Sequence, residues 1–582
     1  MRRTKIVCTI GPASDELDTI KILIQKGMDV ARINFSHGNR EIHAESVEKI
    51  RRASRQLGKR VAILVDTRGP EIRIKDFQQG EVKLIEGQHF TLTTEEVPGD
   101  EHEVSVTYQG LPGDLKEGDH ILLDDGLIEL RVEALTAKEI QTVVIHGGKL
   151  SSRKGLNLPG IAISLPVFSP EDEEDIEFAL HNNVDFIAAS FIRNAADILA
   201  IRYLIEKNKA EAQIIAKIEN REGVENFKEI LQAADGIMIA RGDLGVEIPA
   251  EEVPLVQKRL ITACNFAGKP VITATQMLDS MMRSSRPTRA EASDVANAIF
   301  DGTDAIMLSG ETAVGAFPAE ATGTMARIAE HTEKALNYRE LLKDLQLVID
   351  RSVTDAISYA TCRAAQDLGA RAIISATQSG HTARMVSKYR PKAPIIAVTP
   401  SEKVAAALTL TWGIYPLLCP PTTNTDEIFG TAVEVALEAG LIEDGDLIIL
   451  TAGVPVGVPG TTNFLRIETI GEIIIQGQGV GKEAVTGIVH LAQTAEEALK
   501  IKEKQILVCS DTDKDYLPAM ERADAIITEA GGLTSHAAIV GLNLGKPVVV
   551  GATAATRELS TGQLITVDAA RGLIYRGRAT VI

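Results

Sequence analysis

The chain has 582 residues, of which 45% are hydrophobic and 24% charged, and its formal net charge is −19. This composition is typical of a globular protein, and the length exceeds what one hydrophobic core supports, so we expect several domains. The acidic balance disfavours nucleic acid and anionic membranes as partners. An anionic substrate would therefore need metal ions or a few well-placed Arg and Lys side chains.

The cysteines and the first residues bear on the cellular compartment. Five cysteines are scattered along the chain, and none belongs to a CxxC pair. This pattern indicates reduced thiols, neither a disulfide framework nor a zinc site. The first residues enter a strand-like run without the apolar leader of a secreted protein, and no segment has the length to span a bilayer. We therefore expect a cytoplasmic protein.

From residue 5 to about residue 336, short β-branched runs alternate with longer amphipathic segments, which indicates repeated βα units. Helical patterns follow nearly every run, for instance at residues 15–26, 40–57 and 253–266. Eight such units predict an α/β fold of the TIM (β/α)8 barrel type. The predicted strands are residues 5–10, 30–35, 61–67, 185–191, 213–219, 236–241, 270–275 and 304–309.

One connection in this barrel is much longer than the others. It holds strand-like segments at residues 81–86, 102–106, 120–123 and 139–145, separated by turns rich in Gly, Asp and Pro. The pattern predicts a β-barrel lid domain, inserted after the third strand and placed over the face where active sites form.

The rest of the chain predicts two further domains. A helix at residues 352–368 and strands at 372–376, 395–398 and 446–450 indicate a separate open α/β domain. The glycine-rich residues 476–481 predict a linker into a last section. The predicted domains are residues 1–69 with 167–340 (barrel), 70–166 (lid), 341–474 (α/β) and 475–582 (C-terminal).

The ends of the predicted barrel strands carry charged and hydroxyl side chains, more than the ordinary polarity of a barrel rim explains. Lys217 and Glu219 are two residues apart on one strand and so point to the same face. Glu219 and Asp243 follow adjacent strands, and two carboxylates there predict a Mg²⁺ or Mn²⁺ site that leaves ligand positions for water and substrate. Lys217 and Arg32 would stabilise negative charge on a transferring group. A Schiff base at Lys217 is the alternative, which the nearby carboxylate disfavours because it stabilises the ammonium.

Six segments at these strand ends resemble the motifs of pyruvate kinase, and the resemblance covers about residues 1–471. The resemblance is specific because several long motifs occur in the expected order on the expected strands. The motifs are ARINFSHG (31–38), DTRGPEIR (66–73), KIEN (217–220), ARGDLGVEIP (240–249), ATQMLDSM (274–281) and LSGETAVGAFP (308–318).

The resemblance implies phosphoryl transfer from phosphoenolpyruvate to ADP, giving pyruvate and ATP in the last step of glycolysis. It also implies Mg²⁺ (or Mn²⁺) and K⁺ as cofactors, a homotetramer, and activation by a phosphorylated metabolite. Glu71 is the residue type of the K⁺-dependent members. The implied roles are phosphoenolpyruvate binding by Arg32, Gly242, Asp243 and Thr275; transition-state stabilisation by Lys217 with Arg32; protonation of the enolate organised by Thr275, Ser309 and Glu311, with the donor unassigned; the divalent metal on Glu219 and Asp243; K⁺ on Asn34, Ser36, Asp66 and Thr67; and nucleotide phosphates on Arg73 and Lys154.

A second phosphate site is predicted in the α/β domain, where a loop follows a strand and opens a helix. Hydroxyls and backbone N–H groups at such a position can bind an anion, although an ordinary capped turn is the alternative. The resemblance favours a phosphorylated effector, whose identity the loop does not specify. The glycine-rich residues 452–460 could close over it or form a plain loop. The predicted effector loop is Thr377, Gln378, Ser379, Gly380, His381 and Thr382.

The C-terminal segment TEAGGLTSHAAIV (528–540) resembles the phosphohistidine motif of the swivelling domain in phosphoenolpyruvate synthase and pyruvate phosphate dikinase. His536 is therefore the candidate phosphohistidine. The chain has no room for the ATP-grasp domain that charges such a histidine. The favoured interpretation is a former carrier used for packing, assembly or regulation.

Two rival functions follow from these patterns. A phosphoenolpyruvate synthase or dikinase would need AMP and a phosphorylated His536, and the missing ATP-grasp domain opposes it. A non-catalytic metabolite sensor would show losses at Lys217, Glu219, Asp243 or Thr275, and all four are present.

Overall fold

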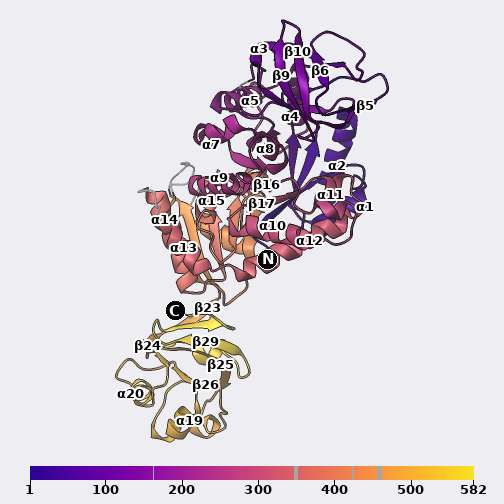
Figure 1. Ribbon diagram of the computed structural model, residues 1–582. Helices are drawn as coiled ribbons and strands as arrows, with labels where there is room; N and C mark the ends of the chain where they lie inside the picture. Colours follow the sequence, from indigo (N-terminus) through magenta and orange to yellow (C-terminus); the bar gives the residue numbers. More distant parts are fainter. Residues whose placement is uncertain (162, 347–351, 422–424, 455–461, 582) are drawn as a thin grey trace. The chain divides into compact units, whose positions relative to one another are not determined.

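The computed structural model describes residues 1–161, 163–346, 352–421, 425–454 and 462–581. The chain divides into two compact units, Met1–Leu341 with Ser401–Pro416, and Leu342–Pro400 with Leu417–Ile582. Figure 1 labels the helices and strands of both units. The domain bounds expected from the sequence stay predictions.

The first unit contains a closed barrel of parallel strands in the order β1-β17-β16-β15-β14-β13-β3-β2, which confirms the eight predicted strands. Successive strand residues alternate between the two sides. Val7 and Leu64 point into the barrel interior, whereas Ile6 and Ile63 pack under the surrounding helices. The strands are β1 (Lys5–Thr9), β2 (Val30–Asn34), β3 (Ala62–Asp66), β13 (Phe186–Ala189), β14 (Gln213–Ile218), β15 (Gly236–Ala240), β16 (Val271–Ala274) and β17 (Ala305–Leu308).

Helices follow each barrel strand, and local signals set their ends. The longest predicted one, residues 40–57, forms as expected because the Asn39 side chain accepts a hydrogen bond from the Ile42 N–H and Gly58 ends the helix with φ 59°. The helices of this unit are α1 (Leu17–Lys26), α2 (Arg40–Leu57), α4 (Pro170–His181), α5 (Ala195–Lys207), α6 (Arg221–Glu225), α7 (Phe227–Ala233), α8 (Arg241–Glu247), α9 (Val253–Ala267), α10 (Arg289–Phe300), α11 (Gly310–Ala313), α12 (Pro318–Ala335) and α16 (Glu402–Leu408), and α13 (Tyr338–Gln346) crosses the division between the units.

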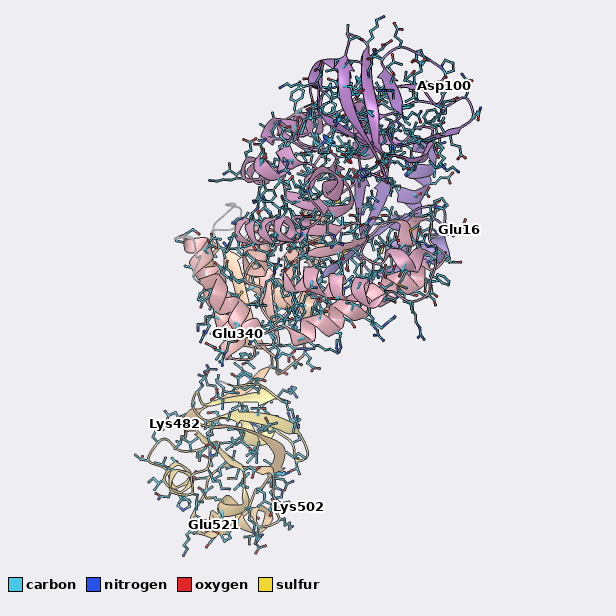
Figure 2. All side chains as sticks on the ribbon, in the orientation of Figure 1. Glu16, Asp100, Glu340, Lys482, Lys502 and Glu521 are labelled. Atoms are coloured by element: carbon cyan, nitrogen blue, oxygen red, sulfur yellow. The ribbon has the colours of Figure 1, made fainter. Side chains whose placement is uncertain are left out.

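The lid is the predicted all-β insertion between β3 and α4 (Figure 1). A seven-stranded sheet, β4-β12-β8-β9-β10-β6-β7, and a two-stranded ribbon, β11-β5, pack around one hydrophobic core. Asp100, labelled in Figure 2, closes one of the turns predicted between the strand-like segments by accepting hydrogen bonds from His102 N (2.8 Å) and Glu103 N (3.1 Å). The elements are β4 (Ile72–Arg73), β5 (Glu81–Leu84), β6 (His89–Thr93), β7 (Glu103–Ser105), α3 (Leu111–Asp114), β8 (His120–Leu123), β9 (Ile128–Leu135), β10 (Glu139–His146), β11 (Gly148–Ser151) and β12 (Gly155–Asn157).

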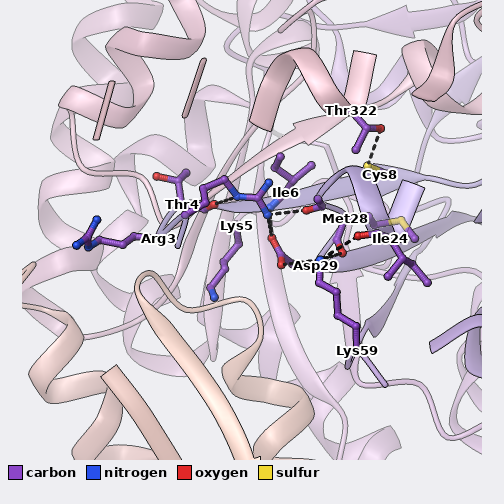
Figure 3. Close-up of polar contacts among 12 residues, drawn as sticks. Arg3, Thr4, Lys5, Ile6, Cys8, Ile24, Met28, Asp29, Lys59 and Thr322 are labelled. Carbon is purple, nitrogen blue, oxygen red and sulfur yellow. Dashed lines mark hydrogen bonds and ion pairs between the residues drawn. The ribbon is translucent and has the colours of Figure 1, made fainter. Parts of the chain in front are cut away.

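The amino ends of the barrel strands hold a partly buried polar cluster, of which Figure 3 shows Lys5, Asp29 and Lys59. Segment Ser401–Pro416 lies in the same compact unit. The Lys5 ammonium donates a hydrogen bond to the Ile414 carbonyl (2.6 Å) and lies 4.8 Å from the centre of the Tyr415 ring. Polar contacts therefore attach residues 401–416, which are distant in sequence, to the amino end of the barrel.

The second unit begins with the predicted open α/β domain. Strands β19, β18 and β21 run parallel, and β22 pairs antiparallel with β21 at the edge. Strand β20 (Ile414–Leu418) crosses the division between the units. The other elements are α14 (Val353–Asp367), β18 (Ala372–Ala376), α15 (His381–Ser387), β19 (Ile395–Thr399), α17 (Thr425–Glu438), β21 (Leu447–Gly453) and β22 (Thr462–Thr469).

The last section forms an eight-stranded sheet in the order β23-β30-β29-β25-β26-β27-β28-β24. Its elements are β23 (Ile473–Gln476), β24 (Gln478–Val480), β25 (Ala484–Leu491), α18 (Ala495–Ala498), β26 (Gln505–Cys509), α19 (Leu517–Arg522), β27 (Ala525–Thr528), α20 (His536–Asn543), β28 (Val548–Val550), α21 (Ala555–Glu558), β29 (Leu564–Asp568) and β30 (Leu573–Arg576).

The prediction of a linker at residues 476–481 is wrong, because this segment supplies parts of both edge strands, β23 and β24. A Cβ on Gly479 would lie 2.0 Å from the Ala569 carbonyl oxygen, and one on Gly477 would lie 2.6 Å from the Val550 carbonyl oxygen. The glycines therefore allow close backbone approach within a sheet, and they do not mark a flexible linker.

Among the described residues, no helix combines the length and the apolar character needed to cross a membrane.

Candidate active site

Lys217 forms the centre of a buried ion-pair network at the carboxyl end of the barrel. Its ammonium lies 2.9 Å from Glu219 Oε1 and 3.0 Å from Asp66 Oδ1, and both carboxylate side chains are 1% exposed. Burial lowers the pKa of Lys217, but the charges of Asp66 and Glu219 more than offset this and leave its pKa raised. The side chain is therefore an ammonium at neutral pH, which supports its predicted electrostatic role and opposes the Schiff-base alternative.

Arg32 joins the same network from β2. Its Nε and Nη2 both lie 2.7 Å from Asp66 Oδ2, and its Nη1 donates a hydrogen bond to Thr9 Oγ1 (2.9 Å). The carboxylate of Asp66 thus holds two cations, and these two charges outweigh burial and keep the pKa of Asp66 low. Two fixed positive charges meet at one point of the barrel mouth, as a site for an anionic group requires.

Glu219 and Asp243 come from neighbouring strands, as predicted, since β14 pairs with β15. Burial raises the pKa of Glu219 to about 7, Lys217 opposes this shift, and Asp243 adds to it. Burial also raises the pKa of Asp243. A buried carboxylate whose pKa is raised in part by a second carboxylate fits a divalent cation, which would relieve the repulsion between them. No group of three or more His, Cys, Asp or Glu side chains that could hold a metal occurs among the described residues. A site built on two carboxylates does not require a third such side chain, because water and substrate oxygens can supply the other ligands.

Thr275 and Gly242 meet directly. The Thr275 hydroxyl accepts a hydrogen bond from the Gly242 N–H (2.6 Å) and donates one to the Ala274 carbonyl (2.7 Å). Thr275 has φ 67° and Gln276 has φ 55°, a left-handed conformation that is strained for a β-branched residue. Such strain concentrates at functional sites, where the surrounding structure maintains it.

Ser309 and Glu311 follow β17. The Glu311 carboxylate accepts hydrogen bonds from the backbone N–H groups of Ser309 (2.7 Å) and Leu278 (3.0 Å). Burial raises the pKa of Glu311. The Ser309 hydroxyl is buried and has no hydrogen-bond partner among the described residues.

The residues predicted to hold K⁺ lie at the ends of β2 and β3, where Asn34 stands opposite Asp66 in the register. Asn34 Oδ1 accepts a hydrogen bond from Ser36 N (3.1 Å), and the Thr67 carbonyl accepts one from Ser190 Oγ (2.7 Å). All four residues offer oxygen atoms, the ligand type that hard cations prefer.

Ser190 belongs to this network, and the sequence analysis missed it. Its hydroxyl accepts a hydrogen bond from the Lys217 ammonium (2.7 Å) and donates to the Thr67 carbonyl. Ser190 follows β13, the fourth barrel strand, at the same rim as the residues that were predicted. Its position at a strand end was the signal that could have identified it.

Arg73 and Lys154 lie on neighbouring lid segments, since Arg73 stands opposite Gly155 in the pairing of β4 with β12. Arg73 forms an ion pair with Glu71 (2.6 Å), and Lys154 forms one with Asp124 (2.8 Å). The two basic side chains are 43% and 41% exposed. Both can therefore exchange an acidic partner for a bound anion at small cost in desolvation.

The predicted effector loop connects β18 to α15, as expected. Gly380 has φ 77° and precedes the helix, and its N–H donates a hydrogen bond to Thr377 Oγ1 (3.0 Å). The Thr382 hydroxyl is buried against Thr462 Oγ1 (2.9 Å). Most of the second glycine-rich segment, residues 455–460, lies outside the described residues.

His536 is the first residue of α20, as the motif predicted. Its Nδ1 lies 3.0 Å from Thr512 Oγ1, a contact that fixes the orientation of the ring. Ile539 and Leu542 follow at helical spacing and are 52% and 65% exposed.

The fold and the barrel mouth define a TIM-barrel enzyme with an inserted lid, arranged to bind an anionic group among fixed cations. The pyruvate kinase barrel domain model matches residues 1–322, the pyruvate kinase alpha/beta domain model matches 355–468, and the model of the PEP-utilising enzyme mobile domain matches 501–572.

Individual relatives agree with these matches. A pyruvate kinase from Geobacillus stearothermophilus is 54% identical and one from Bacillus licheniformis is 52% identical, each over 100% of both chains. A crystal structure of a pyruvate kinase from Cryptosporidium parvum aligns with a TM-score of 0.76 at 40% identity, covering 80% of this chain and 96% of that one. This chain belongs to the pyruvate kinase family and carries an additional PEP-utilising mobile domain.

Proposed function

We propose that this protein transfers the phosphoryl group of phosphoenolpyruvate to ADP, giving pyruvate and ATP, with Mg²⁺ (or Mn²⁺) and K⁺ as cofactors. The observation that carries the proposal is the network in which Lys217 joins Asp66 and Glu219 beside Arg32. Family membership supports the same reaction. The sensor alternative is disfavoured because Lys217, Glu219, Asp243 and Thr275 are all present at the barrel mouth.

Residues of the barrel and of the lid would bind the two substrates and stabilise the reacting groups. Arg32 and the Gly242–Thr275 pair hold the phosphate and carboxylate of phosphoenolpyruvate, and Arg73 and Lys154 hold the nucleotide phosphates. The Lys217 ammonium stabilises the negative charge that builds on the phosphoryl group during transfer. The enolate left behind takes a proton at carbon, and Thr275, Ser309 and Glu311 organise the hydrogen bonds that deliver it.

The cofactors would occupy the two oxygen-lined sites described above. A divalent ion on Glu219 and Asp243 would supply positive charge to the substrate's oxygens. A monovalent ion on Asn34, Ser36, Asp66 and Thr67 would add positive charge nearby, and Glu71 is the residue type that accompanies K⁺ dependence.

A coupled pyruvate-formation assay tests the proposal. We expect activity with phosphoenolpyruvate and ADP only when both Mg²⁺ and K⁺ are present. Activity without K⁺ would refute the monovalent site and leave the reaction standing. No pyruvate under any of these conditions from folded protein would favour the sensor, and a requirement for AMP would favour the dikinase.

The effector loop and His536 carry two further proposals. We expect sugar phosphates or nucleoside monophosphates, tested in turn, to lower the phosphoenolpyruvate concentration at half-maximal rate, and Ser379→Glu to abolish this effect through charge repulsion.

For His536 we propose the role of a former phosphate carrier that is no longer phosphorylated. Mass spectrometry after incubation with phosphoenolpyruvate should find it unmodified, and a phosphorylated His536 would refute this. A homotetramer and a cytoplasmic location remain predictions, and gel filtration tests the first.

A further inference from the structure

Two chain crossings connect the lid to the barrel, and they differ in how the barrel holds them. The outgoing crossing passes Gly69, where φ is 73° and a Cβ would lie 2.8 Å from Ser190 Cβ and 2.9 Å from Phe191 Cδ2. Direct packing against the loop after β13 holds this crossing, together with the Gly69 N–H, which donates a hydrogen bond to Asp172 Oδ1 on α4 (3.3 Å). The Ser190–Asn194 loop also positions the reacting groups, because Ser190 bonds Lys217 and the Phe191 N–H donates to Glu219 Oε2 (2.6 Å).

The return crossing is held by a polar side chain. The Arg193 guanidinium, on the same loop, donates hydrogen bonds through Nη1 to the carbonyl oxygens of Ile163 and Leu165, both at 2.9 Å. Asp197 on α5 holds the guanidinium from the other side, at 3.1 Å from Nε and 3.2 Å from Nη2. The Arg193 and Asp197 side chains are only 15% and 9% exposed, so little water competes for these bonds.

The apolar side chains of the return crossing do not pack solidly against the barrel. A cavity of about 260 Å³ lies between them, with Leu158, Ile163 and Leu165 on the lid side and Phe191 and Asp243 on the barrel side. Close packing would fix this crossing without a polar contact, and a cavity removes that constraint. Asp114 holds Ser164 to the lid, accepting hydrogen bonds from its N–H (3.1 Å) and its hydroxyl (3.0 Å). The Arg193 hydrogen bonds tie the neighbouring carbonyls of residues 163 and 165 to the barrel.

We propose that Arg193 is a positioning residue that fixes the return crossing of the lid and so sets where Arg73 and Lys154 stand over the barrel mouth. Arginine suits this task because its planar fork bonds two carbonyls and one carboxylate at once, which a lysine ammonium cannot do in the same geometry. Arg193 does not touch the predicted substrate groups. Its loss should therefore affect the nucleotide, held by the lid, more than phosphoenolpyruvate, held by the barrel. The kinetic part of this inference rests on the proposed function.

The test compares Arg193→Met and Arg193→Lys with Arg202→Met in the full-length protein. Arg202 is the matched control, because it lies on α5, the helix that follows the Arg193 loop, and it likewise donates to a carbonyl, Ala233 O (2.9 Å), and to a carboxylate, Asp235 (2.9 Å), while contacting no lid residue in these bonds. We expect Arg193→Met to raise amide hydrogen exchange at residues 163–165 at least tenfold and KM for ADP at least tenfold, with KM for phosphoenolpyruvate changed less than twofold. Arg193→Lys should recover part of both, and Arg202→Met should match wild type.

Asp197→Asn provides a second test if Arg193→Met folds poorly, because it weakens the ion pair that holds the guanidinium. It should raise hydrogen exchange at residues 163–165 and KM for ADP by smaller factors. Unchanged exchange at residues 163–165 in Arg193→Met would overturn the proposal, as would equal losses in Arg202→Met. Amide hydrogen exchange can be measured whether or not the protein is enzymatically active. Faster exchange without pyruvate formation in the wild type would therefore keep the structural role of Arg193 and refute the proposed reaction separately.

Discussion

The Lys217 ammonium lies 2.9 Å from Glu219 Oε1, and these two side chains come from positions two residues apart, Lys217 near the end of β14 and Glu219 just beyond it. The contact joins the predicted transition-state stabiliser to a predicted metal ligand. Because Glu219 is 1% exposed, its charge depends on the cations that surround it.

The first prediction concerns protons and the divalent metal at Glu219. Because the pKa of Glu219 is raised to about 7, this carboxyl is largely protonated below pH 7 in the metal-free protein, and Mg²⁺ must displace the proton. We expect the apparent Mg²⁺ affinity to fall about tenfold per pH unit below pH 7 and to level off above it. Titration calorimetry at pH 6 in two buffers of different ionisation enthalpy measures the released proton.

Glu219→Gln should lose both the proton release and most of the affinity, because a neutral amide neither titrates nor neutralises the ion. Glu340→Gln, an exposed change on α13, is the control and should behave as wild type. Equal binding enthalpies in the two buffers at pH 6 would contradict the prediction.

The second prediction concerns catalysis by Lys217. Lys217→Met removes the ammonium and keeps the length of the side chain, so we expect kcat to fall by about 10²–10³-fold or more. The variant also leaves Asp66 and Glu219 with less positive charge nearby, so it should unfold at a lower temperature without Mg²⁺. Steady-state kinetics and thermal unfolding measure the two effects. Lys207→Met, at a half-exposed lysine, should change neither, and a Lys217→Met enzyme within tenfold of wild type would exclude the assigned role.

The third prediction concerns pH and the buried Lys5 ammonium. Burial lowers the pKa of Lys5 to about 8, against an unfolded value of 10.5. Between these values the unfolded chain binds more protons than the native protein at this site, so the contribution of Lys5 to the free energy of unfolding rises with pH, by at most about 1.4 kcal/mol per unit. Below pH 8 the native protein carries the full cost of the buried charge.

Lys5→Met removes that cost, so its stability relative to wild type should be greatest at pH 7 and should decline towards pH 10. Denaturant midpoints at pH 7, 8, 9 and 10 measure the difference, and Lys207→Met is the surface control. A difference that does not change with pH would show that Lys5 keeps its ordinary pKa.

The fourth prediction concerns the glycine-rich segment that resembled a linker. Gly479→Ala places a methyl group 2.0 Å from the Ala569 carbonyl oxygen, so β24 must move away from the sheet. We expect a loss of more than about 2 kcal/mol of stability in the C-terminal section, the range of an overpacked core. Gly532→Ala is the matched control, since its nearest neighbour, Gln478 Oε1, lies at 3.5 Å. Equal thermal unfolding of the two variants would mean that the segment is flexible, as a linker would be.

The sequence determined the barrel and most of its mouth. Strand periodicity located all eight barrel strands to within a few residues, because parallel barrel strands are short, apolar and regularly spaced. The positions of Lys217, Glu219 and Asp243 followed from the same rule, since each lies at or just beyond a strand end. Local signals also determined helix ends such as Asn39 and Gly58.

Only the tertiary structure decided which long-range partners these residues meet. The Ser190 contact with Lys217, the Arg193 contacts with residues 163 and 165, and the attachment of Ser401–Pro416 to the first unit join segments that are distant in sequence. The role of the glycines at 477 and 479 also could not be predicted from the sequence, because a glycine required for close backbone approach and one required for flexibility look alike in sequence. Local pattern encodes backbone preference and the buried face, whereas contacts between distant segments depend on how complete elements pack.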